Sequence, residues 1–487
     1  MKREASLFTA LLPILILIAL LTFNVLLFED TLAGSNQLAL MIAAAVAGLI
    51  SVRLGLKWIT IRGKIVSTIG SAMPSILILL LIGSLAGTWM ISGVVPAMIY
   101  YGLDIISPKL FLFTAVVVSA IVSVATGSSW STIATIGIAL LGIGKALGLS
   151  EAVVAGAIIS GAYFGDKMSP LSDTTNLAPA MAGTDLFTHI RYMAFTTVPS
   201  MIITLIIFLG IGFSSDFAGT LTNVEEVKTS IEATFNTNPL LFLVPVILLT
   251  VIILKVPPLP SLFIGTLLGG IFAVIFQPQI IREIAGIFDN YTQASYISVM
   301  QAMFGDVSLT TTDENVNELL STSGMRGMLD TVWLILSAMV FGGVMESAGL
   351  LKRITQPIVK YAKSTGNLVA STVGTCIFFN TTASDQYIAI VVPGRMFRKN
   401  YEEKGLKPEV LSRTLEDSGT MTSVLIPWNT CGATQSRVLG VATTDYLPYA
   451  FFNIISPFMT MLFAYLNIKI RRTSSNKPKE NSKEQDL

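Results

Sequence analysis

The chain has 487 residues, of which 52% are hydrophobic and only 13% are charged, and its formal net charge is +1. Soluble globular domains carry about 25% charged residues, so this composition excludes a soluble protein and predicts a multi-pass membrane protein. The balanced charge gives no basic excess for a nucleic-acid partner, and the partner that we expect is the lipid bilayer.

Apolar runs that could cross a bilayer recur along the whole chain. A spanning helix needs about 20 apolar residues, so we expect an all-α polytopic fold with about 10–13 membrane segments. Spans are predicted near 7–28, 37–52, 70–92, 109–126, 193–213, 239–254, 257–277, 331–351, 366–383 and 448–468. Polar or helix-breaking residues interrupt four further apolar stretches, which predict either spans or re-entrant segments: 128–149, 151–183, 384–394 and 415–440.

The charges between these spans are sorted by sign. The loop 53–64 has four basic residues and no acid, 395–413 carries six basic residues, and 469–487 carries six more. By contrast, 214–238 has four acids and one lysine, and 278–330 has seven acids and two arginines. Because loops rich in Lys and Arg stay in the cytoplasm, we predict a cell-membrane protein with both termini cytoplasmic. The stretch 214–238 is then an extracellular linker and 469–487 a disordered cytoplasmic tail.

The two halves of the chain resemble each other when the first is shifted by 256 residues. The matching residues lie mainly in the polar breaks rather than in the interchangeable apolar runs: Gly87 falls on Gly343, Gly93 on Gly349, Thr126 on Thr382, Ser128 on Ser384, Thr174 on Thr430 and Asp173 on Asn429. We therefore predict a first transmembrane repeat at 1–213 and a second at 239–468. Transporters are commonly built from such repeats, often inverted, whose broken helices meet near the midplane of the membrane.

The polar breaks are the candidate functional site. Broken helix is tolerated at membrane depth only where it is buried in protein or lines a watery cavity, and acids there are usually functional. Carboxylate, hydroxyl and carbonyl oxygens are the ligands that a hard cation prefers. We predict that a cation and a proton bind at Asp166, Asp173, Thr174, Asn176, Asp385, Asn429 and Thr430. Of these, Asp173, Thr174, Asn429 and Thr430 are expected to hold Na⁺.

Competition between the two ions follows from burial. Burial disfavours the charged form of a carboxylate, so one carboxylate can hold either a proton or a cation near neutral pH. Other roles stay open for several groups. Asp166 or Asp173 could instead pair with Lys167 or Arg191, and Glu416 and Asp417 could lie at the interface beside Arg413. Glu346 could face a cavity, and His189 could sense pH or serve as an interfacial hydrogen-bonding residue.

The stretch "GAYFGDKMSPLSDTTNLAPAMAGTDLFTHIRY" (161–192) resembles the signature of the NhaC family of sodium/proton antiporters. The similarity extends to "TGSSWSTIATIG" (126–137) and "LEDSGTMTSVLIPWNTCGA" (415–433). The resemblance implies two inverted repeats, each with a re-entrant hairpin and an interrupted helix, and a homodimer with elevator-type motion. It places the hairpin tips at Ser128, Ser129 and Thr132 and at Thr382 and Ser384, with interrupted helices near 166–177 and 417–432.

These observations predict a secondary antiporter that exchanges Na⁺ for H⁺. The alternative is a Na⁺- and H⁺-coupled antiporter of small organic anions such as malate and lactate, for which Lys167 and Arg437 are candidate cationic partners. We expect no cofactor, only Na⁺ and H⁺ as transported ions. Neither a nucleotide-binding loop nor an H-E-x-x-H zinc motif occurs in the chain, which argues against an enzyme.

Overall fold

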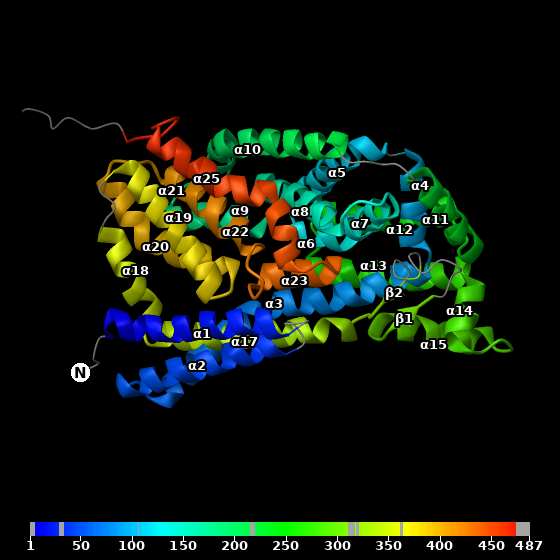
Figure 1. The fold of residues 1–487 in the computed structure, drawn as a ribbon, viewed down its shortest axis with the longest axis horizontal. Helices are drawn as coiled ribbons and strands as arrows, with labels where there is room; N and C mark the ends of the chain where they lie inside the picture. Colours follow the sequence, from blue (N-terminus) through cyan, green and yellow to red (C-terminus); the bar gives the residue numbers. More distant parts are fainter. Residues whose placement is uncertain are drawn as a thin grey trace, which may run out of the picture.

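The computed structural model describes residues 5–28, 34–105, 107–214, 220–309, 317, 321–360 and 364–473. Within these residues the fold is all-α apart from a two-stranded hairpin, as predicted (Figure 1). Eight helices are long and apolar enough to cross a membrane, or up to ten if each of two bent helix pairs is one span. The predicted 10–13 segments also included the re-entrant and interrupted stretches, which the structure builds from shorter helices. The predicted tail lies outside the described residues beyond Thr473.

The first half of the chain contains ten α-helices before the 214–238 stretch. They are α1 (Leu7–Leu27), α2 (Ser35–Arg53), α3 (Trp58–Ile91), α4 (Val94–Ile105), α5 (Phe111–Thr126), α6 (Ser129–Thr132), α7 (Ile138–Ala146), α8 (Glu151–Met168), α9 (Asp173–Ala182) and α10 (Leu186–Ser214). A π-helical stretch, Ile133–Gly137, joins α6 to α7.

The remainder begins with α11 (Thr220–Thr234), which lies inside the predicted linker. The later helices are α12 (Leu243–Ile253), α13 (Pro258–Phe276), α14 (Pro278–Ala285), α15 (Tyr291–Phe304), α17 (Leu329–Ser347), α18 (Leu350–Lys360), α19 (Thr365–Thr382), α20 (Gln386–Glu403), α21 (Pro408–Leu415), α22 (Met421–Ser423), α23 (Thr430–Leu439), α24 (Thr443–Tyr446) and α25 (Phe451–Tyr465). A second π-helical stretch, Glu416–Thr420, lies between α21 and α22. Strands β1 (Val307–Ser308) and β2 (Ser321–Thr322) pair antiparallel.

The repeat predicted from the sequence is visible in the order of the elements. At an offset of 256 residues, α4 begins where α18 begins and α5 ends where α19 ends. At an offset of 257 residues, α9 coincides with α23 at both ends, and each helix is followed by a glycine with left-handed backbone, Gly183 and Gly440. Helices α11 and α12 lie between α10 and the start of this correspondence at α13.

Small residues let α8 pack closely against α5, the first arm of the first hairpin. A Cβ atom on Gly161 of α8 would lie 2.2 Å from the carbonyl oxygen of Val116 of α5, and one on Gly165 would lie 2.4 Å from that of Ala120. The Ser123 hydroxyl donates across the same contact to the Ala162 carbonyl at 2.6 Å. Close backbone approach through small residues is the usual way in which membrane helices associate. This packing fixes α8, and with it the acids at its end.

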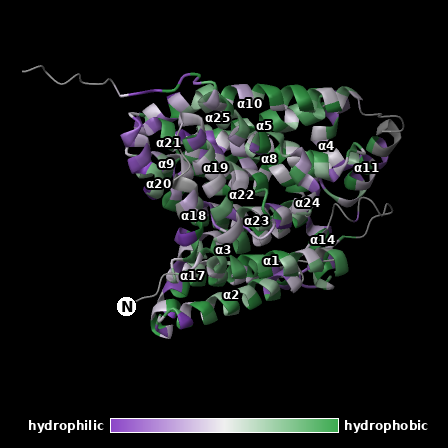
Figure 2. Ribbon diagram, turned by 60° about the vertical axis from the view of Figure 1, so that its left-hand side comes forward, coloured by the Kyte–Doolittle hydropathy of each residue, from purple (hydrophilic) through white to green (hydrophobic). Residues whose placement is uncertain are grey.

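The two ends of the molecule differ in their elements and polarity. In Figure 1 the N-terminus and the end of α25 lie at the left, whereas α11 and α14 lie at the right. Hydrophobic residues cover much of α1, α2 and α10 in Figure 2, and hydrophilic residues gather near α18, α20 and α21. The start of α1 and the end of α25 therefore lie on the side of α18, α20 and α21 and opposite α11.

Candidate functional site

The tip of the first hairpin is bonded to the break of the first interrupted helix. Gly127 ends α5 with a left-handed φ of 69°, and the Ser128 hydroxyl caps α6 by accepting from the Ser131 amide at 3.2 Å. The amide N–H and hydroxyl of Ser129 both donate to Asp166 Oδ2, at 3.1 and 2.6 Å. The Asp166 carboxylate thus joins the hairpin tip to the end of α8.

The second repeat makes the equivalent connection with neutral groups. The Asn429 side-chain amide donates to the Asn380 carbonyl oxygen at 3.0 Å, and the Thr430 amide donates to the Ser384 carbonyl at 3.0 Å. Asp385 caps α20 by accepting from the Ile388 amide at 2.9 Å. All of these side chains are buried except that of Ile388, which is partly exposed.

A cavity of about 370 Å³ opens beside the first break. Of the predicted site residues, it is lined by Ser128, Asp166, Asp173 and Thr174. The second repeat contributes Gln386 and Tyr387 at the start of α20, whereas Asn429 and Thr430 are outside the lining and almost fully buried. The first break and the tip of the second hairpin therefore face one cavity, and the second break lies behind it.

The remaining predicted residues have local hydrogen bonds or caps. Thr132 donates to the Ser128 carbonyl at 2.9 Å and Thr382 to the Phe378 carbonyl at 2.7 Å, each within its own segment. Asn176 is exposed, and its amide donates to the Ser172 carbonyl at 2.7 Å. These bonds stabilise the turns from which the cavity residues project.

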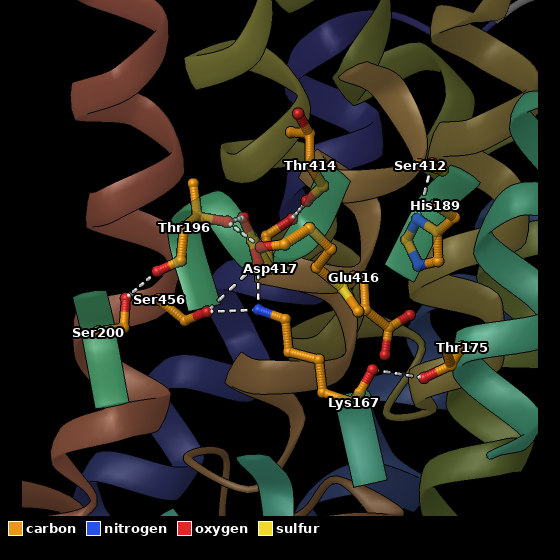
Figure 3. Close-up of polar contacts among 12 residues, drawn as sticks. Lys167, Thr175, His189, Thr196, Ser200, Ser412, Thr414, Glu416, Asp417 and Ser456 are labelled. Atoms are coloured by element: carbon orange, nitrogen blue, oxygen red, sulfur yellow. Dashed lines mark hydrogen bonds and ion pairs between the residues drawn. The ribbon is translucent and has the colours of Figure 1, made fainter. Parts of the chain in front are cut away.

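A buried ion pair joins the two repeats (Figure 3). Lys167 Nζ, at the end of α8, bonds to Asp417 Oδ1, and both side chains are fully buried. The same ammonium donates to the Ser456 hydroxyl at 2.9 Å, while Asp417 Oδ2 accepts from the Thr196 hydroxyl at 2.9 Å. Because every one of these groups is away from water, the pair depends on its partners for stability.

Glu416 lies next to this pair and faces the first break. Its Oε1 accepts from the Thr174 hydroxyl at 3.0 Å, so a residue that lines the cavity contacts an acid behind the cavity wall. Glu416 and Asp417 are both fully buried inside the protein. Arg413 itself is buried, with its guanidinium carbon 4.5 Å from the centre of the Tyr192 ring.

Other open assignments are also resolved. Lys167 pairs with Asp417 rather than with an acid of its own repeat. Glu346 forms an ion pair with Lys64 at 2.7 Å at the molecular surface. His189 is buried, and its Nδ1 lies 2.8 Å from the Ser412 hydroxyl. Sequence reasoning missed Ser75 and Lys255 as cavity residues, because they come from segments without a polar break. It also missed Gln386 and Tyr387, which lie in the interrupted stretch 384–394 but carry no charge.

The donor set fits hard cations. Across the described part of the chain, His, Cys, Asp and Glu form no group of three or more that could hold a metal ion. The two cysteines, Cys376 and Cys431, are buried and free. Carboxylate and hydroxyl oxygens, such as those at the first break, are suited to Na⁺.

A helical membrane protein in which two repeats bring interrupted helices and buried acids together has the architecture of a secondary transporter. The chain belongs to the Na⁺/H⁺ antiporter family, whose sequence model matches residues 161–468. This confirms the family resemblance seen in the sequence.

Similar proteins cover nearly the whole chain. The Na⁺/H⁺ antiporter NhaC of Alkalihalophilus pseudofirmus is 37% identical over 90% of this chain and 92% of its own. The malate-2H⁺/Na⁺-lactate antiporter of Bacillus subtilis is 36% identical over 96% of this chain and 97% of its own. Among solved structures, MtrF of Neisseria gonorrhoeae aligns with 94% of this chain and 95% of its own, with a TM-score of 0.35 and 14% identity.

Proposed function

We propose that this protein is a secondary active antiporter that exchanges Na⁺ for H⁺ across the cell membrane. The observation that carries the proposal is the cavity at the first break, where Asp166 and Asp173 lie beside the hydroxyls of Ser128 and Thr174. Membership of the Na⁺/H⁺ antiporter family and the name of the NhaC relative support the same exchange.

The chemistry of the exchange rests on competition at these carboxylates. Asp173 begins α9 and is exposed to the cavity, so a hydrated ion can reach it, whereas Asp166 is partly covered and bonded to Ser129. A carboxylate in such a site is stabilised either by a cation or by a proton, and one replaces the other. Na⁺ and H⁺ are the transported ions, and no cofactor takes part in this scheme.

An organic anion is a second candidate substrate. The observation that favours it is the size of the cavity. Its volume of about 370 Å³ falls in the range of about 300–1,000 Å³ found for small-molecule sites. Lys255 contributes a positive charge to the same lining. The malate-2H⁺/Na⁺-lactate relative supports this candidate, in which a carboxylate would travel together with the exchanged ions.

The proposal also includes the membrane orientation of the termini and the oligomeric state. Both termini are cytoplasmic, because the described ends lie on the side of the basic segments. The protein acts as a homodimer, as its family resemblance implies, and it is a transporter without enzymatic activity.

Flux in proteoliposomes tests the exchange. A Na⁺ gradient should drive proton movement, read with a pH-sensitive dye, and Asp173→Asn should reduce the rate by at least about tenfold, because the amide cannot neutralise the cation. Glu402→Gln is the control, since Glu402 pairs with Arg398 on the surface of α20. Wild-type exchange in Asp173→Asn would overturn the assignment. Labelled malate or lactate that neither moves nor changes Na⁺ flux would exclude the second candidate.

A further inference from the structure

The Glu416 carboxyl is only half satisfied in a dry environment. Its Oε1 accepts from Thr174, but among the described residues its Oε2 has no hydrogen-bond partner, although the side chain is fully buried. A buried polar atom without a partner costs about 1–3 kcal/mol, and more when the group is charged. Such an atom indicates that something else occupies this position during the working cycle.

The neighbouring lysine is already committed to another acid. Lys167 and Asp166 are the charged groups of α8 that act most strongly on the Glu416 carboxyl. Lys167 is paired with Asp417, and both oxygens of Asp417 are engaged, one by Lys167 and one by Thr196. The pair is neutral as a unit, so Lys167 does not balance the charge that Glu416 carries when it is ionised. A single monovalent cation would balance it.

A second oxygen without a partner lies beside the first. Threonine and serine hydroxyls nearby donate to the carbonyl four residues earlier: Thr414 to Val410, Ser418 to Thr414 and Thr422 to Ser418, at 2.6–2.8 Å. Thr420 is buried with its hydroxyl close to the Glu416 carboxyl, but this contact lacks the geometry of a hydrogen bond, and the hydroxyl has no other partner within the described residues. Thr420 is the last residue of the π-helical stretch Glu416–Thr420, and π-helical turns are frequent at functional sites.

Thr174 connects this position to the cavity. It lines the cavity, its hydroxyl lies 3.2 Å from the Ser172 hydroxyl, and on its other side it donates to Glu416. Because Thr174 gives its proton to Glu416, the Ser172 hydroxyl is the donor in their contact, which leaves one lone pair of the Thr174 oxygen for a cation. The position is therefore one side chain behind the cavity wall, within reach of an ion that has shed its water.

We propose that Glu416, Thr420 and Thr174 form a second Na⁺ site, distinct from the Asp166 and Asp173 carboxylates of the cavity. Carboxylate and hydroxyl oxygens are hard ligands that suit a dehydrated alkali cation. The site rests on the proposed function, because it is reached through the same cavity and holds the transported ion in a dry environment between the two repeats.

Binding of ²²Na⁺ to the purified full-length protein at alkaline pH tests this site. The wild type should bind one more equivalent of Na⁺ than Glu416→Gln, an isosteric change that can still accept from Thr174. Thr420→Val should weaken the same equivalent by about tenfold, because it removes one ligand. The matched controls are Glu346→Gln, at a surface ion pair, and Thr204→Val, whose buried hydroxyl donates within its own helix at 2.8 Å; both should bind as the wild type does.

The outcomes separate this site from the exchange itself. If Glu416→Gln and Thr420→Val bind the same number of Na⁺ ions with the same affinity as the wild type, the second site does not exist, and Glu416 holds only a proton. The Asp173→Asn variant should still bind the equivalent of Na⁺ that the Glu416→Gln variant no longer binds. Loss of both equivalents in either variant would overturn the proposal of two distinct sites. A wild type that binds Na⁺ but moves no protons in liposomes would contradict the antiporter function and leave the binding site standing.

Discussion

The two breaks have the same position in the repeat but different surroundings. The first, between α8 and α9, borders the cavity, and both Asp173 and Asn176 are exposed there. The second, between α22 and α23, is dry, and Asn429 and Thr430 are buried with their polar groups bonded to the hairpin of the same repeat. One repeat therefore presents an ionisable group to an ion, while the other closes its break with amides.

The residue types at the two breaks explain the difference. Asp173 is the first residue of α9, whereas Asn429 caps α23 from the position before its first residue. A side-chain amide can both donate and accept hydrogen bonds. The Asn429 side chain therefore has partners inside the protein: it donates to Asn380 and accepts from the Cys431 amide at 3.0 Å. A carboxylate can only accept, so Asp173 needs water, a proton or a cation.

The largest effect is expected where the repeats are joined. Lys167→Met should leave Asp417 as an uncompensated buried charge and lower the free energy of unfolding by about 3–5 kcal/mol, because the pair is fully buried. Thermal unfolding in detergent measures this. The double variant Lys167→Met with Asp417→Asn should recover most of the loss, since it removes both charges. Equal stability of the single variant and the wild type would show that the pair does not hold the repeats together.

The second break can be made to resemble the first. Asn429→Asp should lower the free energy of unfolding by about 2–3 kcal/mol near neutral pH, because a carboxylate in this dry position repels the Asn380 oxygens to which Asn429 donates. Asn176→Asp, in the exposed first break, is the matched control and should change stability by less than about 0.5 kcal/mol. If Asn429→Asp left the free energy of unfolding unchanged, water would reach the second break as well. The claim that the second break is dry and the first is not would then be wrong.

Much of this architecture could be predicted from residues alone. Apolar runs predicted the long helices, and the polar breaks predicted that the chain is interrupted before α9 and before α23. The predicted span 70–92 covers only part of α3, which begins at Trp58. The helix continues past its apolar part, and Arg62 and Lys64 lie near its N-terminal end. Hydropathy marks the part of a helix that can lie in lipid rather than the ends of the helix.

The contacts between the repeats could not be predicted in the same way. Lys167 and Asp417 are 250 residues apart, and nothing in either local pattern says which acid the lysine contacts. Nor does composition tell a break that borders a cavity from one that is buried, because Thr174 and Thr430 have similar neighbours in sequence. Those differences depend on which helices pack over each break, and that is decided by the whole fold.

The smallest expected effects concern the two hairpin tips, which use the left-handed backbone differently. The first tip has Gly127 at a φ of 69°, and the second has Ser384 at a φ of 58°. Gly127→Ala should lower the free energy of unfolding by about 1–2 kcal/mol, since its Cβ would lie 2.5 Å from the Leu171 Cβ. Ser384→Gly should instead raise it by about 0.5 kcal/mol, because glycine adopts this conformation without strain.

The critical result is that Gly127→Ala and Ser384→Gly change the free energy of unfolding in opposite directions. Thermal unfolding of both variants under the same conditions measures these changes. Gly210→Ala, in α10 with open space around the added Cβ, is the control for placing alanine in a membrane helix. The loss in Gly127→Ala has a specific cause, which is the contact between the first tip and the first break. If Gly127→Ala were as stable as Gly210→Ala, that contact would be loose, and the rigid placement of Asp166 by Ser129 would no longer follow from the packing of the tip.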